Sequence, residues 1–146
     1  MRLSFFLVLI VLGFTQVNAQ SVQPSIEAKV VYNASQNNVK GLKIFPKISL
    51  DKRKNTDIVV YASFYMENGV ELKQFSKLFC CEDVAHTTDI KEVKQGEEAQ
   101  TFLFIPYDGL NLAENKVHKV KFDLKVSGYD IDIQSDKTYH SIINLL

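Results

Sequence analysis

The stretch at residues 57–73, DIVVYASFYMENGVELK, carries the strongest fold signal in the sequence. Side chains of an extended chain alternate between two faces, and both sets of alternate positions between Ile58 and Met66 are largely apolar. This pattern indicates a central strand. Asn68 and Gly69 tolerate the positive φ angles that two-residue primed turns require, so we expect the strand to turn back there as a β-hairpin.

Shorter alternating patterns predict strands on both sides of this hairpin. A strand at residues 42–50 contains Pro46, which has no N–H, so we expect an edge strand or a bulge at that residue. Residues 34–40 are predicted to form a polar loop. Region 74–95 is the least regular: residues 76–82 are predicted to be extended or to form a single helical turn, and residues 87–94 to form a loop with one short strand. Residues 129–133 either continue the strand before them or open a hairpin. The other predicted strands lie at residues 26–32, 99–106, 117–127 and 139–145.

Together these segments predict an all-β fold. About seven or eight short strands, separated by polar turns and without a convincing helical period, favour an antiparallel sandwich of two sheets, immunoglobulin-like or C2-like. The clearest amphipathic strand, at residues 117–127, is expected to supply part of the core, because one of its faces holds His118, Val120, Phe122, Leu124 and Val126.

Residues 1–19 have the pattern of a secretory signal peptide. Arg2 precedes an apolar stretch, and Val17-Asn18-Ala19 offers small residues for cleavage before Gln20. The apolar stretch is short for a membrane span, and no second one follows. We therefore expect a single β-sandwich domain at residues 20–146, secreted to the periplasm, the cell surface or the extracellular space, without a membrane span.

The charge balance argues against nucleic acid as a partner. The sequence has 17 Lys+Arg and 17 Asp+Glu residues, whereas binding to nucleic acid or an anionic membrane needs a basic excess or patch. The one basic run, Lys52-Arg53-Lys54, has Asp51 and Asp57 nearby and fits a solvated turn.

Three motifs resemble a small β-sandwich domain of exported bacterial proteins. This resemblance covers roughly residues 30–126 and implies the fold and export. It brings no established activity and transfers no site residue. The motifs are Phe64-Tyr65-x-x-Asn68-Gly69-x-x-Leu72-Lys73, Ile105-Pro106-Tyr107-x-x-Leu110-x-Leu112 and His118-x-Val120-x-Phe122-x-Leu124-x-Val126.

Cys80-Cys81 is the most unusual pair of residues in the chain. Adjacent cysteines in an exported protein form a strained vicinal disulfide, bridge to another chain or remain free thiols. The chain has only these two cysteines, so a staple to a distant strand is excluded. Glu82-Asp83 follows the pair, and neighbouring acids raise a thiol pKa, which argues against a reactive thiolate.

Metal ligation has two candidate sets, and neither matches a known pattern. Zinc would need Cys80, Cys81 and His86 with a fourth ligand such as His118 or His140, but the spacing fits no closed four-ligand site. Calcium needs about six or more oxygens, and the turn-forming acids supply them at no fixed spacing. These acids are Asp108, Asp130, Asp132 and Asp136. We expect no metal and no cofactor.

The sequence lacks nucleophile-elbow, zincin and phosphate-loop motifs, so we expect a non-catalytic binding module. The first hypothesis is a protein partner at a sheet edge or at the end loops. The alternative is a carbohydrate or small-ligand binder with exposed tyrosines, because such rings combine apolar area with a polar group. A redox or metal role of the cysteines is third, and Asn33-Ala34-Ser35 matches an N-glycosylation site. The candidate tyrosines are Tyr61, Tyr65, Tyr107 and Tyr129.

Overall fold

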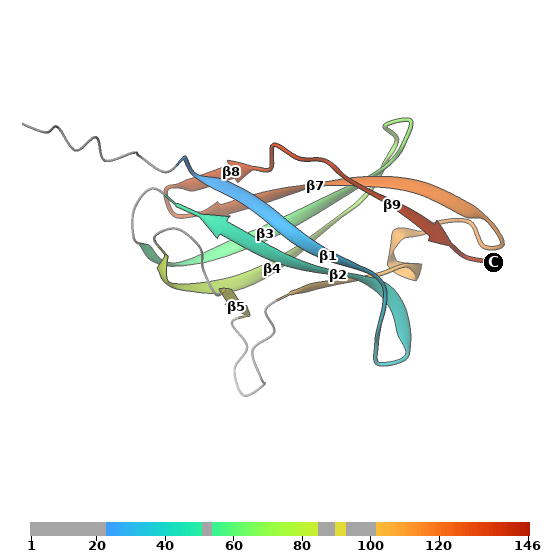
Figure 1. Ribbon diagram of the computed structural model, residues 1–146, viewed down its shortest axis with the longest axis horizontal. Coiled ribbons are helices and arrows are strands. Elements are labelled where there is room, and N and C mark those ends of the chain that lie inside the picture. The colour runs from blue at the N-terminus through green and yellow to red at the C-terminus, as the bar shows by residue number, and fades with distance from the viewer. Residues whose placement is uncertain (1–22, 51–53, 85–89, 93–101) are drawn as a thin grey trace, which may run out of the picture.

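The computed structural model describes residues 23–50, 54–84, 90–92 and 102–146. These segments contain nine strands and one 3-10 helix, shown in Figure 1. None of their helices is long and apolar enough to cross a membrane. The predicted signal peptide lies outside the described residues. The elements are β1 (Ser25–Gln36), β2 (Val39–Ser49), β3 (Lys54–Met66), β4 (Glu71–Val84), β5 (Ile90–Glu92), β6 (Leu103–Pro106), η1 (Asp108–Leu110), β7 (Val117–Gly128), β8 (Ile131–Gln134) and β9 (Tyr139–Asn144).

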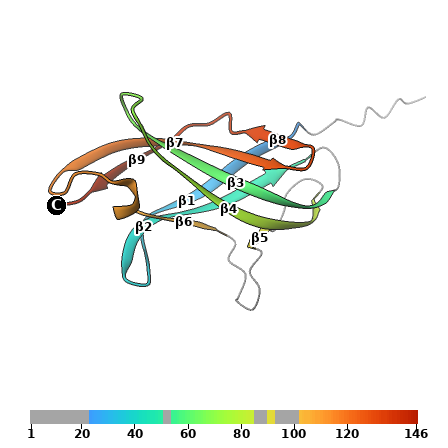
Figure 2. The same cartoon turned by 180° about the vertical axis from the view of Figure 1, so that it is seen from behind.

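The strands form two antiparallel sheets, which confirms the predicted β-sandwich. The smaller sheet has the order β1-β2-β6, and the larger has the order β5-β4-β3-β7-β8, with β9 pairing to the other end of β7. β1 and β2 lie in front of β3 and β4 in Figure 1 and behind them in Figure 2. This pairing corresponds to strands A-B-E and C′-C-F-G of an immunoglobulin-like sandwich.

β3 is the central strand of the larger sheet, as its two apolar faces predict. It pairs with β4 on one side and with β7 on the other. Phe64 and Phe122, which are opposite each other in β3 and β7, are buried and stack with ring centroids 4.8 Å apart. The predicted inward face of β7 is also confirmed, because all five of its residues from His118 to Val126 are buried.

The two tight hairpins differ from the prediction in their turns. The hairpin at Asn68-Gly69 is present, but its loop has three residues: the Met66 N–H donates to Val70 O at 2.8 Å, and Gly69, at φ 89°, has the only positive φ in the loop. A type I turn followed by a left-handed residue has this form. The predicted polar loop at 34–40 is instead strand on both sides of a two-residue turn, with Asn37 and Asn38 at φ 50° and 63°.

Three other local predictions can be compared with the structure. Residues 74–84 continue β4, in which buried Phe79 lies opposite Ile58, so the extended alternative for residues 76–82 is confirmed; β5 is the expected short strand. Pro46 does lie at a locally open edge, since the described part of β6 pairs with β2 only at residues 41–44. The segment after β7 opens a hairpin, in which Gly128 pairs with Ile131.

Three tyrosine hydroxyls bond to groups at the β1 edge, and those of Tyr139 and Tyr32 join the two sheets. The Ala28 N–H of β1 donates to the Tyr139 hydroxyl of β9 at 2.7 Å. The Tyr32 hydroxyl donates to the carbonyl oxygen of His140 at 3.1 Å. The Tyr107 hydroxyl accepts the Asn33 N–H at 2.9 Å and donates to Asn33 Oδ1. These bonds satisfy backbone groups that would otherwise be exposed at a sheet edge.

We predict that Tyr139→Phe lowers the free energy of unfolding by about 1 kcal/mol, because it leaves the Ala28 N–H without its partner while keeping the ring. Urea denaturation measures this change. Tyr129→Phe is the control, since Tyr129 is 82% exposed and should show no change. Equal stability of the two variants would contradict a structural role for the Tyr139 hydroxyl.

We also predict that Gly41→Ala destabilises the protein by about 2–3 kcal/mol. A Cβ at Gly41 would collide with the carbonyl oxygen of Ile105 and lie 2.9 Å from its carbonyl carbon, where β2 and β6 approach. Gly69→Ala adds a Cβ that meets nothing within 4 Å and should cost about 1 kcal/mol, from the positive φ alone. Thermal or urea unfolding compares the two, and a larger loss at Gly69 would disprove the close approach.

Candidate functional site

Within the part of the chain that the structure describes, the outer side of β4 is an unpaired strand edge over much of its length. β4 pairs with β3 from Glu71 to Val84, but on its other side β5 covers only residues 79–81. Residues 71–78 pair on one side only, as far as the described chain extends. β4 thus offers the kind of sheet edge that the sequence predicted without placing it.

The hydrogen-bonding direction of β4 follows from two bonds near the hairpin. The Met66 N–H donates toward β4, to Val70 O, whereas the next amide, that of Glu67, donates to Lys119 O on the β7 side at 3.2 Å. Amides alternate in direction along an antiparallel strand. The even-numbered residues of β3 therefore exchange backbone hydrogen bonds with the β4 residues opposite them. The residues between those partners, Gln74, Ser76 and Leu78, therefore turn their N–H and C=O groups to the open edge.

A groove of about 270 Å³ lies beside this edge, where β4 and β6 approach each other. The side chain of Lys77 crosses the groove, and its Nζ donates to the carbonyl oxygen of Phe102 at 3.0 Å. Gln36 places a buried Oε1 here that has no hydrogen-bond partner among the described atoms. The groove is lined by Gln36, Phe75, Ser76, Lys77, Leu103, Phe104 and Ile105.

Two lysine ammonium groups lie over aromatic rings at or next to the groove: Phe75 lines it, and Phe102 precedes the lining residue Leu103. Lys73 Nζ lies 5.3 Å from the centroid of the Phe75 ring, and Lys43 Nζ lies 4.7 Å from that of Phe102. Both distances are within the range of cation–π attraction. Lysine ammonium groups therefore lie beside aromatic rings near the groove, which suits a segment that carries both apolar and acidic side chains.

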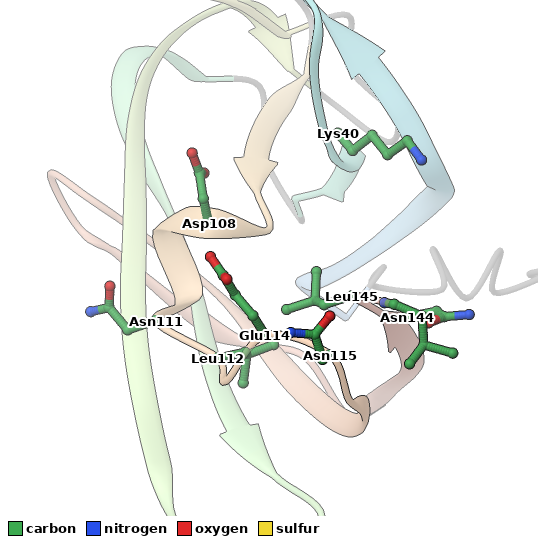
Figure 3. A pocket seen from close by; sticks show the side chains of 9 residues that line it. Lys40, Asp108, Asn111, Leu112, Glu114, Asn115, Asn144 and Leu145 are labelled. Carbon is green, nitrogen blue, oxygen red and sulfur yellow. The ribbon is translucent and has the colours of Figure 1, made fainter.

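A second cleft, shown in Figure 3, lies at the end of the sandwich where the η1–β7 loop meets the last strand. Its volume is about 590 Å³. The Asn115 N–H donates to Leu145 O at 3.0 Å, and the Leu145 N–H donates to Lys116 O at 3.1 Å, so backbone bonds fix the two walls together. The cleft is lined by Lys40, Asp108, Asn111, Leu112, Glu114, Asn115, Asn144, Leu145 and Leu146.

The four candidate tyrosines do not converge. Tyr61 and Tyr65 are half-buried on the outer face of β3, four residues and so about 13 Å apart along the strand. Tyr129 is exposed in the β7–β8 turn. Tyr107 is buried, and desolvation raises the pKa of its hydroxyl although the bond from Asn33 opposes the shift. Tyr107 therefore belongs to the core, not to an exposed platform.

The cysteines are described only through their backbone. Cys80 and Cys81 lie in β4, opposite Asp57 and Thr56 of β3. Their side chains lie outside the described part of the structure, so the disulfide and redox hypotheses stay predictions.

The metal hypotheses find no cluster in the described segments, where no three His, Cys, Asp or Glu side chains could hold an ion. His86 lies outside them. His118 is buried and its Nε2 bonds to Ala113 O at 2.7 Å. His140 bonds through Nδ1 to Glu67 Oε1 at 2.8 Å, and this bond lowers the pKa of the Glu67 carboxyl. The calcium candidates do not form such a group either; among them, Asp132 instead pairs with Lys125 at 2.9 Å.

Apart from Asp108, the residues that line the groove and the cleft were not candidate site residues in the sequence, where Ile105 and Leu112 were named only in a motif. Phe75 and Lys77 lie in the irregular region, where no pattern indicated which side faces outward. The cleft had one local signal: Asn111 and Asn115 flank a short loop and have positive φ values of 54° and 56°, which asparagine tolerates better than most residues.

Comparison with known proteins does not assign this site. No family model, no curated protein and no solved structure matches the chain. The resemblance to a domain of exported bacterial proteins therefore stays a prediction.

Proposed function

We propose that the protein is an exported, non-catalytic module that binds an extended segment of a partner protein along the β4 edge. One observation carries this proposal: residues 71–78 of β4 pair on one side only within the described chain, next to the β4–β6 groove. A partner strand added there would gain main-chain hydrogen bonds from the edge and side-chain contacts from the groove.

The side chains beside the outward amides support strand addition. Proteins commonly protect exposed edges with charged side chains, prolines or bulges. Gln74, Ser76 and Leu78 are uncharged and exposed on the outer face, so no charge stands at these three positions. Lys77, which lies between Ser76 and Leu78, is instead held across the groove by its bond to Phe102 O.

The opposite edge of the sandwich serves as a comparison within the molecule. There the outward Ala28 and Asn33 amides of β1 already bond to tyrosine hydroxyls, so an added strand would have to displace them. Strand addition at β4 displaces no bond of this kind among the described residues. The edge of β4 is therefore the better acceptor of the two.

We predict that peptides selected from a random displayed library bind the wild-type protein and lose at least about tenfold affinity for Ser76→Pro, because proline removes an outward N–H. Ser76→Ala keeps the N–H and should bind within about twofold of the wild type. Binding is measured by calorimetry, and amide shifts should map to Gln74, Ser76 and Leu78.

Gln74→Pro, with Gln74→Ala as its control, repeats the test at a second outward amide in case Ser76→Pro does not fold. Urea unfolding verifies that each variant is folded. Peptides that bind both proline variants as tightly as the wild type, or whose shifts map to Tyr61 and Tyr65, would disprove recognition at the β4 edge. Failure of the library to yield any binder would equally count against it.

A further inference from the structure

The end cleft is built independently of the β4 edge and has a rigid frame. Two backbone bonds join residues 115–116 to Leu145, and the buried His118 ring holds the loop through Ala113 O. Lys40 O accepts the Tyr107 N–H at 3.0 Å, which fixes the third wall. The cleft shares no lining residue with the β4–β6 groove.

Several polar groups in the cleft have no partner among the residues that the structure describes. The side chains of Asp108, Glu114 and Asn115 make no hydrogen bond or ion pair with the described residues. Asn144 Oδ1 accepts the Leu146 N–H at 3.0 Å, which leaves its NH₂ group to donate. In Figure 3, Glu114, Asn115 and Leu145 lie in the middle of the view, between Asp108 on one side and Asn144 on the other.

The lining restricts the class of ligand. An anion would face two carboxylates, Asp108 and Glu114, against one ammonium group, that of Lys40. A metal ion finds no group of three ligating side chains in the described chain. A fully apolar ligand would leave the amides and carboxylates of the cleft dehydrated and unpaired, which is costly.

A neutral, polyhydroxylated ligand satisfies all of these groups. Amides donate and accept, carboxylates accept and ammonium donates, so together they match hydroxyl groups that do both. Leu112 and Leu145 provide apolar surface for the C–H face of such a ligand. The volume lies within the range of about 300–1,000 Å³ that is usual for small-molecule sites.

We propose that the end cleft, with Glu114, Asn115 and Asn144 as its main hydrogen-bonding residues, binds a neutral carbohydrate. This assignment differs from a tyrosine platform, because the cleft contains no tyrosine. The probes are glucose, galactose, mannose and N-acetylglucosamine, added to the isotope-labelled full chain up to about 20 mM each. At least one sugar should shift the amide signals of residues 111–115 and 144–146 saturably.

Glu114→Gln keeps the shape of the side chain but removes the carboxylate, and we predict about tenfold weaker sugar binding, as expected for loss of a charge-assisted hydrogen bond. Asn144→Ala should weaken binding as well. Glu27→Gln, an exposed acid on β1, and Ser76→Pro should leave it unchanged. The two proposals can therefore be disproved separately, because sugar binding and peptide binding are tested by substitutions at different residues.

Three outcomes would overturn the carbohydrate site. One is the absence of a saturable shift with any of the four sugars. Another is a shift that maps to Tyr61 and Tyr65 and is lost in Tyr65→Ala but kept in Glu114→Gln. The third is a saturable shift of the cleft amides by calcium or phosphate in place of sugars.

Discussion

The sandwich depends on the way Tyr139 connects its two sheets. The ring stacks on Phe122 at 5.0 Å between centroids, nearly parallel at 12°, and Phe122 stacks in turn on Phe64 of the central strand. The hydroxyl at the other end of the same side chain accepts the outward Ala28 N–H of β1. One residue therefore supplies apolar contact to the larger sheet and satisfies a backbone donor of the smaller one, a combination that tyrosine allows.

This connection makes the two sides of the sandwich unequal. On the β1 side, Tyr32, Tyr107 and Tyr139 engage groups that a sheet edge would expose. On the β4 side, within the described chain, the sheets are linked by Lys77, a long side chain whose Nζ donates to the carbonyl oxygen of Phe102. A long side chain is ordered at a larger entropic cost than a ring, so the β4 side is the easier of the two to open or to extend with another strand.

Local periodicity predicted the elements that carry the fold but not their turns. β7 was predicted because its apolar residues alternate with polar ones, and β3 because both of its faces are apolar; burial of one face then fixes the register. Asn68-Gly69 was predicted to form a two-residue turn but lies in a three-residue loop, whereas Asn37-Asn38 was predicted to lie in a polar loop but forms a two-residue turn. Both pairs permit a primed turn, so their residue types do not decide the loop length. The choice between a two-residue and a three-residue loop is made by the flanking pairs: Leu72 is an extra residue in β4 opposite the step from Phe64 to Tyr65, and this bulge lengthens the first loop.

The candidate sites were harder to predict, because they depend on strand order and not on residue type. Lys40, Glu114 and Asn144 are far apart in the sequence, and only the pairing of β9 with β7 and of β2 with β6 brings them around one cleft. The tyrosines show that residue type does not determine position. Tyr65 lies on an outer face, Tyr107 in the core and Tyr129 at an exposed turn. Open edges and clefts of a sandwich are therefore the places to look for its function, since a tyrosine in a strand is placed by the register first.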